Sequence, residues 1–426
     1  MRVAFINIDD TLGGASIACV RLAETLEKKG LDVTIFTQKK NTEKNIVQAI
    51  SEKWWLKKIT FLNFLIERTY FFFYEKDKSV RFSFSPSISG IDITKYVDLK
   101  TFDIIHLHWT NFGFLSNTSI KRIFDLNIPI VWTMHDMWLM TGGCHHSGDC
   151  LNFQTGCGEC EQYLKRPSTS DLSFRLNQVK FELFKKKKNI HIVGCSEWIS
   201  NRARKSKVLG NLKITTIPNP LNQRVFFPIN KENAKESMAL EEKKTYILFS
   251  AMKVSVSWKG YGYLKESLEI LYMGCNKKEA EGIEVLIVGE AAPESKHDFR
   301  FKTHILGRIN DPDKLNTIYN TADIFVSSSI QENLPNTLIE ALACGTPCAA
   351  FNIGGIPEII DHKKNGFLAK YKSSESLAEG IQWVLRNNDD KQLSLNAREK
   401  VNKFFSEDVV AKKYLELYNS VLECRS

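Results

Sequence analysis

His135 and Asp136 stand side by side at the end of the stretch PIVWTMHD. An imidazole next to a carboxylate can move protons or line a polar site at neutral pH. The residues before the pair form a short apolar run that is typical of a buried strand. The pair therefore falls at the carboxyl end of a predicted strand, where open α/β sheets place their ligands. We predict that His135 and Asp136 line a functional cleft.

A cluster of four cysteines follows, with the spacing C-x5-C-x6-C-x2-C. The final CGEC has a spacing that zinc sites favour, and His145 or His146 could replace one thiolate. Three interpretations stay open: a structural zinc, free thiols, or disulfides, and a reducing cytoplasm argues against the last. Because the segment has few apolar residues, a crosslink would help to give it shape. The cluster consists of Cys144, Cys150, Cys157 and Cys160.

The second chemical signal is a pair of glutamates in ENLPNTLIE, Glu332 and Glu340. The apolar run ADIFVSSS before them predicts a strand, and a helix is predicted from about Asn336. The N-terminus of a helix presents N–H groups and the positive end of its dipole, which suits a phosphate. One turn inside the helix, Glu340 could accept hydrogen bonds from two ribose hydroxyls, and Glu332 could bind hydroxyls of the group on the phosphate. The alternative interpretation is a pair of solvated or capping glutamates.

These residues need parallel strands to position them, and both halves of the chain supply such strands. In the first half VAFINI, LDVTIFT, DIIHLHW, PIVWTMH and NIHIVGCS alternate with helical segments, beginning with a glycine turn at Gly13 and Gly14. After the proline-rich stretch at 214–228, the pattern restarts with TYILFSAM, EVLIVGE, THILGRI, ADIFVSSS and PCAAFN. Short apolar strands that alternate with helices predict parallel sheets covered on both faces.

The predicted fold class is therefore α/β, with two Rossmann-like doubly wound domains. We place the first domain at 1–215 and the second at 220–405. The last segment, 406–426, has the apolar spacing of an amphipathic helix, which we expect to pack back on the first domain.

The composition is that of a soluble globular protein, with 43% hydrophobic and 25% charged residues in 426. The sequence contains no run of 18 apolar residues, and the N-terminal MRVAFINIDD reads as a strand, not a signal peptide. We therefore expect a cytoplasmic protein. Ten cysteines are too few for a disulfide scaffold of this length.

The positive charge lies in the first half. Residues 1–215 hold 31 Lys and Arg against 21 Asp and Glu, a net +10, which leaves −1 for the rest of the total of +9. Such a half could face a membrane, a nucleic acid or a phosphorylated substrate, or could serve solubility alone. The segment 54–74, WWLKKITFLNFLIERTYFFFY, has polar residues on one helical face and apolar ones on the other. It fits either an interfacial helix on a bilayer or a helix packed on a sheet.

In combination these motifs resemble the retaining, nucleotide-sugar-dependent glycosyltransferases of family four, the group 1 glycosyl transferases, which have the GT-B fold. The E-x7-E element is followed by ALACGTP and GGIPEII. The similarity also includes GGAS near the N-terminus, WTMHD, IPNP, the Lys259–Gly260 pair and the final helix, so it covers nearly the whole chain.

The resemblance implies two domains that face each other across a cleft, with a nucleotide diphosphate-sugar held by the second. Lysines would neutralise the diphosphate in place of a metal, so no cofactor is expected for catalysis. The catalytic residues implied are His135 beside the reacting sugar, Glu332 on the donor sugar and Lys259 on the diphosphate. Donor-binding residues implied are Gly13, Gly14, Lys253, Lys259, Arg308 near the base, Leu334, Asn336, Thr337, and Glu340 on the ribose.

The sequence departs from the family pattern at two places. The family usually has an arginine five residues before the lysine of the Lys-Gly pair, where this chain has Val254, and Lys253 lies one residue earlier. The family also has a glycine where this chain has Pro335, which has no N–H to offer a phosphate. The phosphate is then expected to rely on Asn336 and Thr337.

The function implied is transfer of a sugar, of the hexosyltransferase type and with retention, to a glycan or lipid-linked acceptor in surface polysaccharide synthesis. Together with the basic first half and the 54–74 segment, this suggests a peripheral place on the inner face of the plasma membrane. The alternatives are a sugar-nucleotide epimerase or phosphorylase on the same fold, or a nucleic-acid-binding module. We expect no nucleic-acid partner, because the aromatic residues do not form the stacking platforms that such proteins use.

Overall fold

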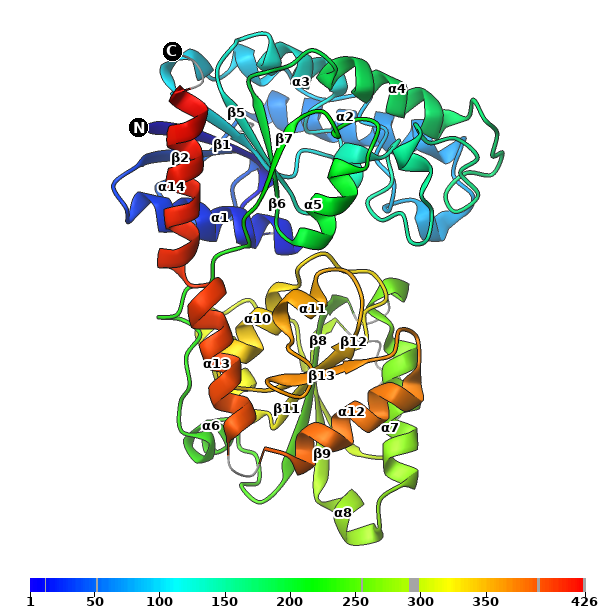
Figure 1. Ribbon diagram of the computed structural model, residues 1–426, viewed down its shortest axis with the longest axis vertical. Coiled ribbons are helices and arrows are strands. Elements are labelled where there is room, and N and C mark those ends of the chain that lie inside the picture. Colours follow the sequence, from blue (N-terminus) through cyan, green and yellow to red (C-terminus); the bar gives the residue numbers. More distant parts are fainter. Residues whose placement is uncertain (12, 51–52, 254–255, 291–298, 389–390, 424–426) are drawn as a thin grey trace. The chain divides into compact units, whose positions relative to one another are not determined.

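The computed structural model describes residues 1–11, 13–50, 53–253, 256–290, 299–388 and 391–423, without the side chain of Lys253. The chain divides into two compact units. Unit 1 comprises Met1–Pro218 and Ala411–Ser426, and unit 2 comprises Asn219–Val410. Helices lie on both faces of the sheet in each unit (Figure 1).

Unit 1 is built on a seven-stranded sheet in the order β3-β2-β1-β4-β5-β6-β7, with every neighbouring pair parallel. Apolar runs buried on both faces explain why these segments form inner strands. The strand order reverses between β1 and β4, which is the switch point where such sheets bind ligands. The strands are β1 (Arg2–Asp9), β2 (Asp32–Lys39), β3 (Val47–Ala49), β4 (Ile104–Leu107), β5 (Ile130–Met134), β6 (Ile190–Gly194) and β7 (Lys213–Thr216).

The helices of unit 1 begin at clear capping signals in three cases. Ser116, Asp171 and Ser196 each accept a backbone N–H with their side chains and so begin α3, α4 and α5. The α-helices are α1 (Gly13–Glu27), α2 (Trp54–Phe72), α3 (Asn117–Phe124), α4 (Leu172–Phe184), α5 (Glu197–Arg204) and α14 (Glu407–Glu423). Short 3-10 turns lie at Lys78–Val80, Ile93–Lys95, Leu99–Thr101, Trp138–Met140 and Asn152–Gln154.

The C-terminal helix α14 is bonded to the core of unit 1 through two buried tyrosines. The Tyr418 hydroxyl lies 2.7 Å from His106 Nδ1, and the Tyr414 hydroxyl lies 3.0 Å from Thr133 Oγ1. His106 and Thr133 belong to the neighbouring strands β4 and β5. The end of the chain therefore contributes to the core of the same unit as its beginning.

Unit 2 is a six-stranded parallel sheet in the order β10-β9-β8-β11-β12-β13. The strands are β8 (Thr245–Lys253), β9 (Ile283–Glu290), β10 (Lys302–Gly307), β11 (Ile324–Ser327), β12 (Cys348–Phe351) and β13 (Gly366–Ala369). Its helices are α6 (Lys231–Ser237), the 3-10 turn η6 (Ser257–Lys259), α7 (Tyr261–Met273), α8 (Lys277–Glu281), α9 (Pro312–Thr321), α10 (Asn336–Ala343), α11 (Ile356–Ile359), α12 (Ser374–Arg386) and α13 (Gln392–Phe404).

The strand order of unit 2 reverses between β8 and β11. The predicted fold class, two doubly wound parallel α/β units, is confirmed. Among the described residues no helix is both long enough and apolar enough to cross a bilayer.

Candidate functional site

In unit 2 the loops that follow β8 and β11 bring a lysine and a glutamate together at the switch point. Lys259 ends η6, and its Nζ donates to Glu332 Oε1, although the two residues are 73 positions apart. The Glu332 side chain is 14% exposed and that of Lys259 is 30% exposed, so both can be reached from solvent. The structure therefore brings into contact two residues that the family resemblance assigned to the donor site.

Two glycines allow the backbone to come close enough to form this corner. A Cβ on Gly260 would lie 1.9 Å from Ser328 O, and one on Gly354 would lie 1.9 Å from Glu332 O. Both glycines have positive φ, which other residues rarely adopt. The Ser328 hydroxyl also donates to Lys259 O at 3.0 Å. The position of the Lys259–Glu332 pair is thus determined by the close packing of the loops that carry it.

Glu340 lies in α10, as predicted, and its side chain is buried. Only 5% of Glu340 is exposed, and its Oε2 accepts a hydrogen bond of 2.9 Å from the Tyr319 hydroxyl of α9. A carboxylate held in this way by a neighbouring helix keeps one orientation. The Tyr319 contact was not predicted from sequence, because no short motif links residues of α9 and α10.

The loop that precedes α10 carries the remaining predicted donor residues of this region. α10 begins at Asn336, so the helix start predicted near this residue is confirmed. Pro335 is the N-cap residue and makes no side-chain capping bond. Asn336 and Thr337 form the first turn and are partly exposed, whereas Leu334 is 7% exposed and packs inward. The Asn336 Oδ1 accepts a hydrogen bond of 3.2 Å from Asn219 Nδ2 in the IPNP segment.

The two other predicted cations of unit 2 are Arg308 and Lys253. Arg308 follows β10, is exposed, and donates from Nε to Asn310 Oδ1 at 3.1 Å. Lys253 ends β8, but its side chain lies outside the described residues, as does Val254.

In unit 1 the predicted residues lie after the carboxyl ends of β1 and β5. Gly13 and Gly14 begin α1 after β1, and His135 directly follows β5. His135 Nε2 lies 3.0 Å from Nδ1 of His108, and the two imidazole rings stack on each other. His108 directly follows β4. His108 was missed by sequence reasoning, although the alternation in HLHW at the end of a buried strand was a usable signal.

Asp136 holds the local structure together and is not a free base. Its Oδ2 accepts from Trp109 Nε1 at 2.8 Å and from His145 Nδ1 at 2.7 Å, and its Oδ1 accepts from the Trp138 N–H at 2.8 Å. Burial opposes ionisation of this carboxyl, but His145 and the Trp138 N–H outweigh it and lower its pKa to about 2. Asp136 is therefore ionised at neutral pH and orders the residues that follow His135.

Burial keeps the histidines of this edge uncharged. It lowers the pKa of His135 to about 4 despite the opposing effect of Asp136, and it lowers the pKa of His106 and His108 well below the ordinary value. As the pH falls, these imidazoles take up a proton at a higher pH in the unfolded chain than in the folded one. Unit 1 therefore loses stability as the pH falls below about 6.5.

We predict that replacing His135 by Gln makes the stability less dependent on pH between 6.5 and 4. In the wild type this histidine contributes a slope of at most about 1.4 kcal/mol per pH unit, which the variant lacks. Urea unfolding at several pH values, followed by tryptophan fluorescence, measures this slope, because the buried Trp132 and Trp138 lie beside the site. Equal slopes in the two proteins would contradict the assignment of His135 as a buried neutral group.

The structure shows no metal site among the described residues of the cysteine cluster, where zinc was one of the three interpretations left open. Within the described part of the chain, which includes all four cysteines, no three His, Cys, Asp or Glu side chains form a group that could hold a metal ion. The thiols have other surroundings: Cys150 is exposed, and Cys157 Sγ accepts the Gly142 N–H at 3.2 Å. Burial raises the pKa of Cys157 to about 12 and that of Cys160 to about 11. Cys144, Cys150, Cys157 and Cys160 are free thiols.

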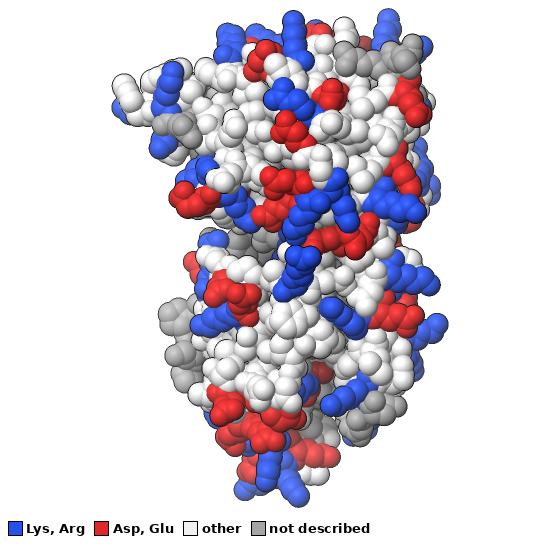
Figure 2. All heavy atoms as spheres, turned by 90° about the vertical axis from the view of Figure 1, so that its left-hand side faces the viewer, with Lys and Arg blue, Asp and Glu red and all other residues white. Residues whose placement is uncertain are grey.

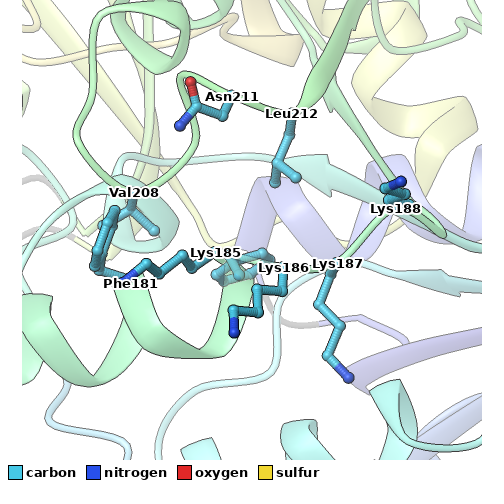
Figure 3. Close-up of a pocket in the computed structure, with 9 residues that line it drawn as sticks. Phe181, Lys185, Lys186, Lys187, Lys188, Val208, Asn211 and Leu212 are labelled. Atoms are coloured by element: carbon cyan, nitrogen blue, oxygen red, sulfur yellow. The ribbon is translucent and has the colours of Figure 1, made fainter.

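Neither of two cavities in unit 1 has the properties of a sugar site. The cavity beside His108, His135 and Asp136 has a volume of about 10 Å³, which is room for one water molecule at most. The other, of about 220 Å³, is lined by the end of α4, the segment that follows it, and residues that precede β7 (Figure 3). Four consecutive lysines, Lys185–Lys188, line it together with Phe181, Phe184, Val208, Asn211 and Leu212.

Each half of the chain matches the model of a known protein family. Residues 12–224 match the family described as Glycosyltransferase Family 4, and residues 230–401 match the family described as Glycosyl transferases group 1. The chain belongs to the group 1 glycosyltransferases. The family predicted from the motifs is confirmed.

Relatives and solved structures agree with this membership. This glycosyltransferase is 24% identical over 365 residues to the UDP-Gal:alpha-D-GlcNAc-diphosphoundecaprenol alpha-1,3-galactosyltransferase of Escherichia coli, covering 80% of this chain and 84% of the relative. In four other curated relatives the match spans between 32% and 63% of their length.

Two solved structures show that this glycosyltransferase has the GT-B fold. Sucrose-phosphate synthase from Thermosynechococcus elongatus superimposes with a TM-score of 0.68 at 18% identity, covering 99% of each chain. The HepE protein of Anabaena, solved in complex with UDP, superimposes with a TM-score of 0.62 at 15% identity, covering 99% of this chain and 100% of its own.

Proposed function

We propose that this glycosyltransferase is a retaining enzyme that moves a sugar from a nucleotide diphosphate-sugar to a glycan or lipid-linked acceptor in surface polysaccharide synthesis. The observation that carries the proposal is the Lys259–Glu332 pair at the switch point of unit 2, in a chain of this family. The bound UDP of the HepE structure and the diphosphoundecaprenol acceptor of the Escherichia coli relative support the substrate classes.

In this proposal the donor binds to unit 2. Lys259, the first turn of α10 and Lys253 attract the diphosphate, because cations and helix N-termini stabilise the negative charge that grows on a leaving diphosphate. Glu340 binds the ribose, Glu332 binds the donor sugar, and Arg308 lies near the base. Leu334, Asn336 and Thr337 shape the loop around the phosphates. The proposed transfer step uses no metal or other cofactor.

In the transfer step the bond between the anomeric carbon and the diphosphate oxygen breaks, and a bond to the acceptor oxygen forms on the same face of the sugar. The acceptor hydroxyl gives its proton to the departing diphosphate, so no enzyme nucleophile is needed. We assign to His135 a place beside the reacting sugar, where a neutral imidazole can accept a hydrogen bond. Gly13 and Gly14 allow close approach of the backbone to the substrates. We place the reaction on the inner face of the plasma membrane, where a lipid-linked acceptor is found.

The test is an assay with nucleotide-sugars and a sugar-diphospho-undecaprenol acceptor. We expect transfer to the acceptor, with the anomeric configuration of the donor kept in the product, as read by the proton coupling constant in NMR. Inversion would refute the retaining mechanism. Turnover of the nucleotide-sugar to its epimer without an acceptor would refute transfer and favour an epimerase.

A further inference from the structure

Helix α2 of unit 1 turns an apolar face to solvent. Trp54, Phe61, Leu65 and Phe72 recur at intervals of seven, four and seven residues, which places them in one stripe along the helix. Their exposed fractions are 68%, 60%, 41% and 52%. Further exposed apolar side chains widen the stripe, namely Trp55, Ile59, Leu62, Ile66 and Phe73. We refer to these nine residues as the α2 face.

The opposite side of α2 is buried and mixes apolar with polar side chains, namely Leu56, Thr60, Glu67, Arg68 and Phe71. Glu67 is fully buried, with its Oε1 2.8 Å from Arg68 Nη2 and its Oε2 accepting the Gly113 N–H at 2.8 Å. Arg68 also donates to Phe84 O at 3.1 Å. These bonds reach two separate loops and set the rotation of α2 about its axis. The apolar side chains that α2 packs inward are Leu56 and Phe71, so the α2 face is not the side that the helix packs on unit 1.

The exposed charges on α2 itself are positive. Glu67 is the only acidic residue of α2 and is buried, so the exposed charges of the helix are Lys57 and Lys58, with Lys53 just before it. Lys58 Nζ lies 4.8 Å from the centre of the Trp54 ring. Tryptophan and lysine beside an apolar stripe are the residues that lie at the headgroup level of a bilayer, where a lysine gains from anionic lipid.

We propose that the α2 face docks on an anionic lipid bilayer and lies in the plane of the membrane surface. Since α2 is not among the helices that could cross a bilayer, the contact is interfacial. A second copy of this chain is the alternative occupant, and the oligomeric state of the wild type tests it. On the face shown in Figure 2, Lys and Arg are interspersed with Asp and Glu. The choice of a bilayer rests in part on the proposed lipid-linked acceptor.

Vesicle flotation of the full chain without donor or acceptor tests this inference. We expect the wild type to float with vesicles that contain roughly 30% phosphatidylglycerol, and to bind phosphatidylcholine vesicles at least tenfold less. The variant Phe61→Ser, Leu65→Ser, Phe72→Ser should lose at least tenfold of its binding to the anionic vesicles. The matched control, Met273→Ser with Leu395→Ser, removes two apolar side chains of unit 2 that are 67% and 63% exposed, and should bind as the wild type does.

The lysines are tested separately with Lys57→Gln, Lys58→Gln, which should weaken binding to anionic vesicles only. Thermal unfolding should be unchanged in all variants, because each replaced side chain is exposed. The proposal is overturned if the wild type stays unbound, or if the triple serine variant floats as well as the wild type. It is also overturned if sedimentation shows a wild-type dimer that the triple variant dissociates, without vesicle binding. Because flotation contains no substrate, its failure would leave transfer to a soluble acceptor intact, whereas failure of the transferase proposal would leave flotation intact.

Discussion

Replacing Lys259 by Met is expected to lower kcat by about 10²- to 10³-fold, because one positioned charge on a developing anion contributes about 3–4 kcal/mol in a catalytic site. Lys259 ends η6 beside Glu332, and the close approach of Gly260 to Ser328 holds it there. The methionine keeps most of the length of the side chain and removes the charged ammonium group with its donors. Steady-state kinetics with donor and acceptor measure the effect.

A second lysine of unit 2, Lys278 in the exposed part of α8, provides the control. Lys278→Met should leave kcat within twofold of the wild type. Lys259→Arg should recover part of the lost rate, because it restores the charge with a different geometry. A loss of less than tenfold in Lys259→Met would show that the diphosphate relies on other groups and would remove Lys259 from the catalytic residues.

Replacing Glu340 by Gln is expected to weaken donor binding by about 10²-fold. Hydrogen bonds to a charged group contribute about 1.5–3 kcal/mol, and the carboxylate is proposed to bind the ribose hydroxyls. Glutamine has nearly the same shape and can still accept from the Tyr319 hydroxyl, so the fold of α10 should persist. Isothermal titration with the nucleotide diphosphate measures the dissociation constant.

A deoxyribose form of the nucleotide makes this test specific. The wild type should lose affinity for the deoxy form, whereas Glu340→Gln should bind both forms about equally, as a double-mutant cycle requires. Glu379→Gln, an exposed position on α12, should behave as the wild type. If Glu340→Gln still discriminates between the two forms as strongly as the wild type, then Glu340 does not bind the ribose.

Features that depend on neighbours in the chain were predictable. The apolar runs predicted β1, β2, β4, β5, β6 and β8 to β12, whereas the short strands β3, β7 and β13 were not predicted. The helix predicted from about Asn336 begins there, directly after Pro335. The family resemblance rested on such local motifs, and it identified Lys259, Glu332 and Glu340 as one functional group. The structure brings the first two of these into contact and places Glu340 in α10, the helix that begins after Glu332.

The zinc interpretation concerns a feature that depends on residues distant in the chain, and spacing alone could not decide it. The spacing of a cysteine pair is a local property, but a metal site needs three or four ligands to converge, and convergence depends on the whole loop. The Cys157 sulfur instead accepts from the Gly142 N–H and from Asn177 Nδ2, partners that no spacing encodes. Likewise, the sequence shows only that Asp136 follows His135, whereas the structure gives its carboxylate three hydrogen-bond donors.

The sequence by itself determined the fold class, the family and the residue types at the sheet edges, because apolar periodicity and short motifs are read from adjacent positions. Only the tertiary structure decided that Lys259 meets Glu332, that His108 meets His135, and that α2 turns its apolar side outward. For α2 the periodic pattern is the same whichever side is buried. The choice depends on Glu67 finding the Gly113 N–H, 46 residues away, and such long-range partners are supplied only by the folded chain.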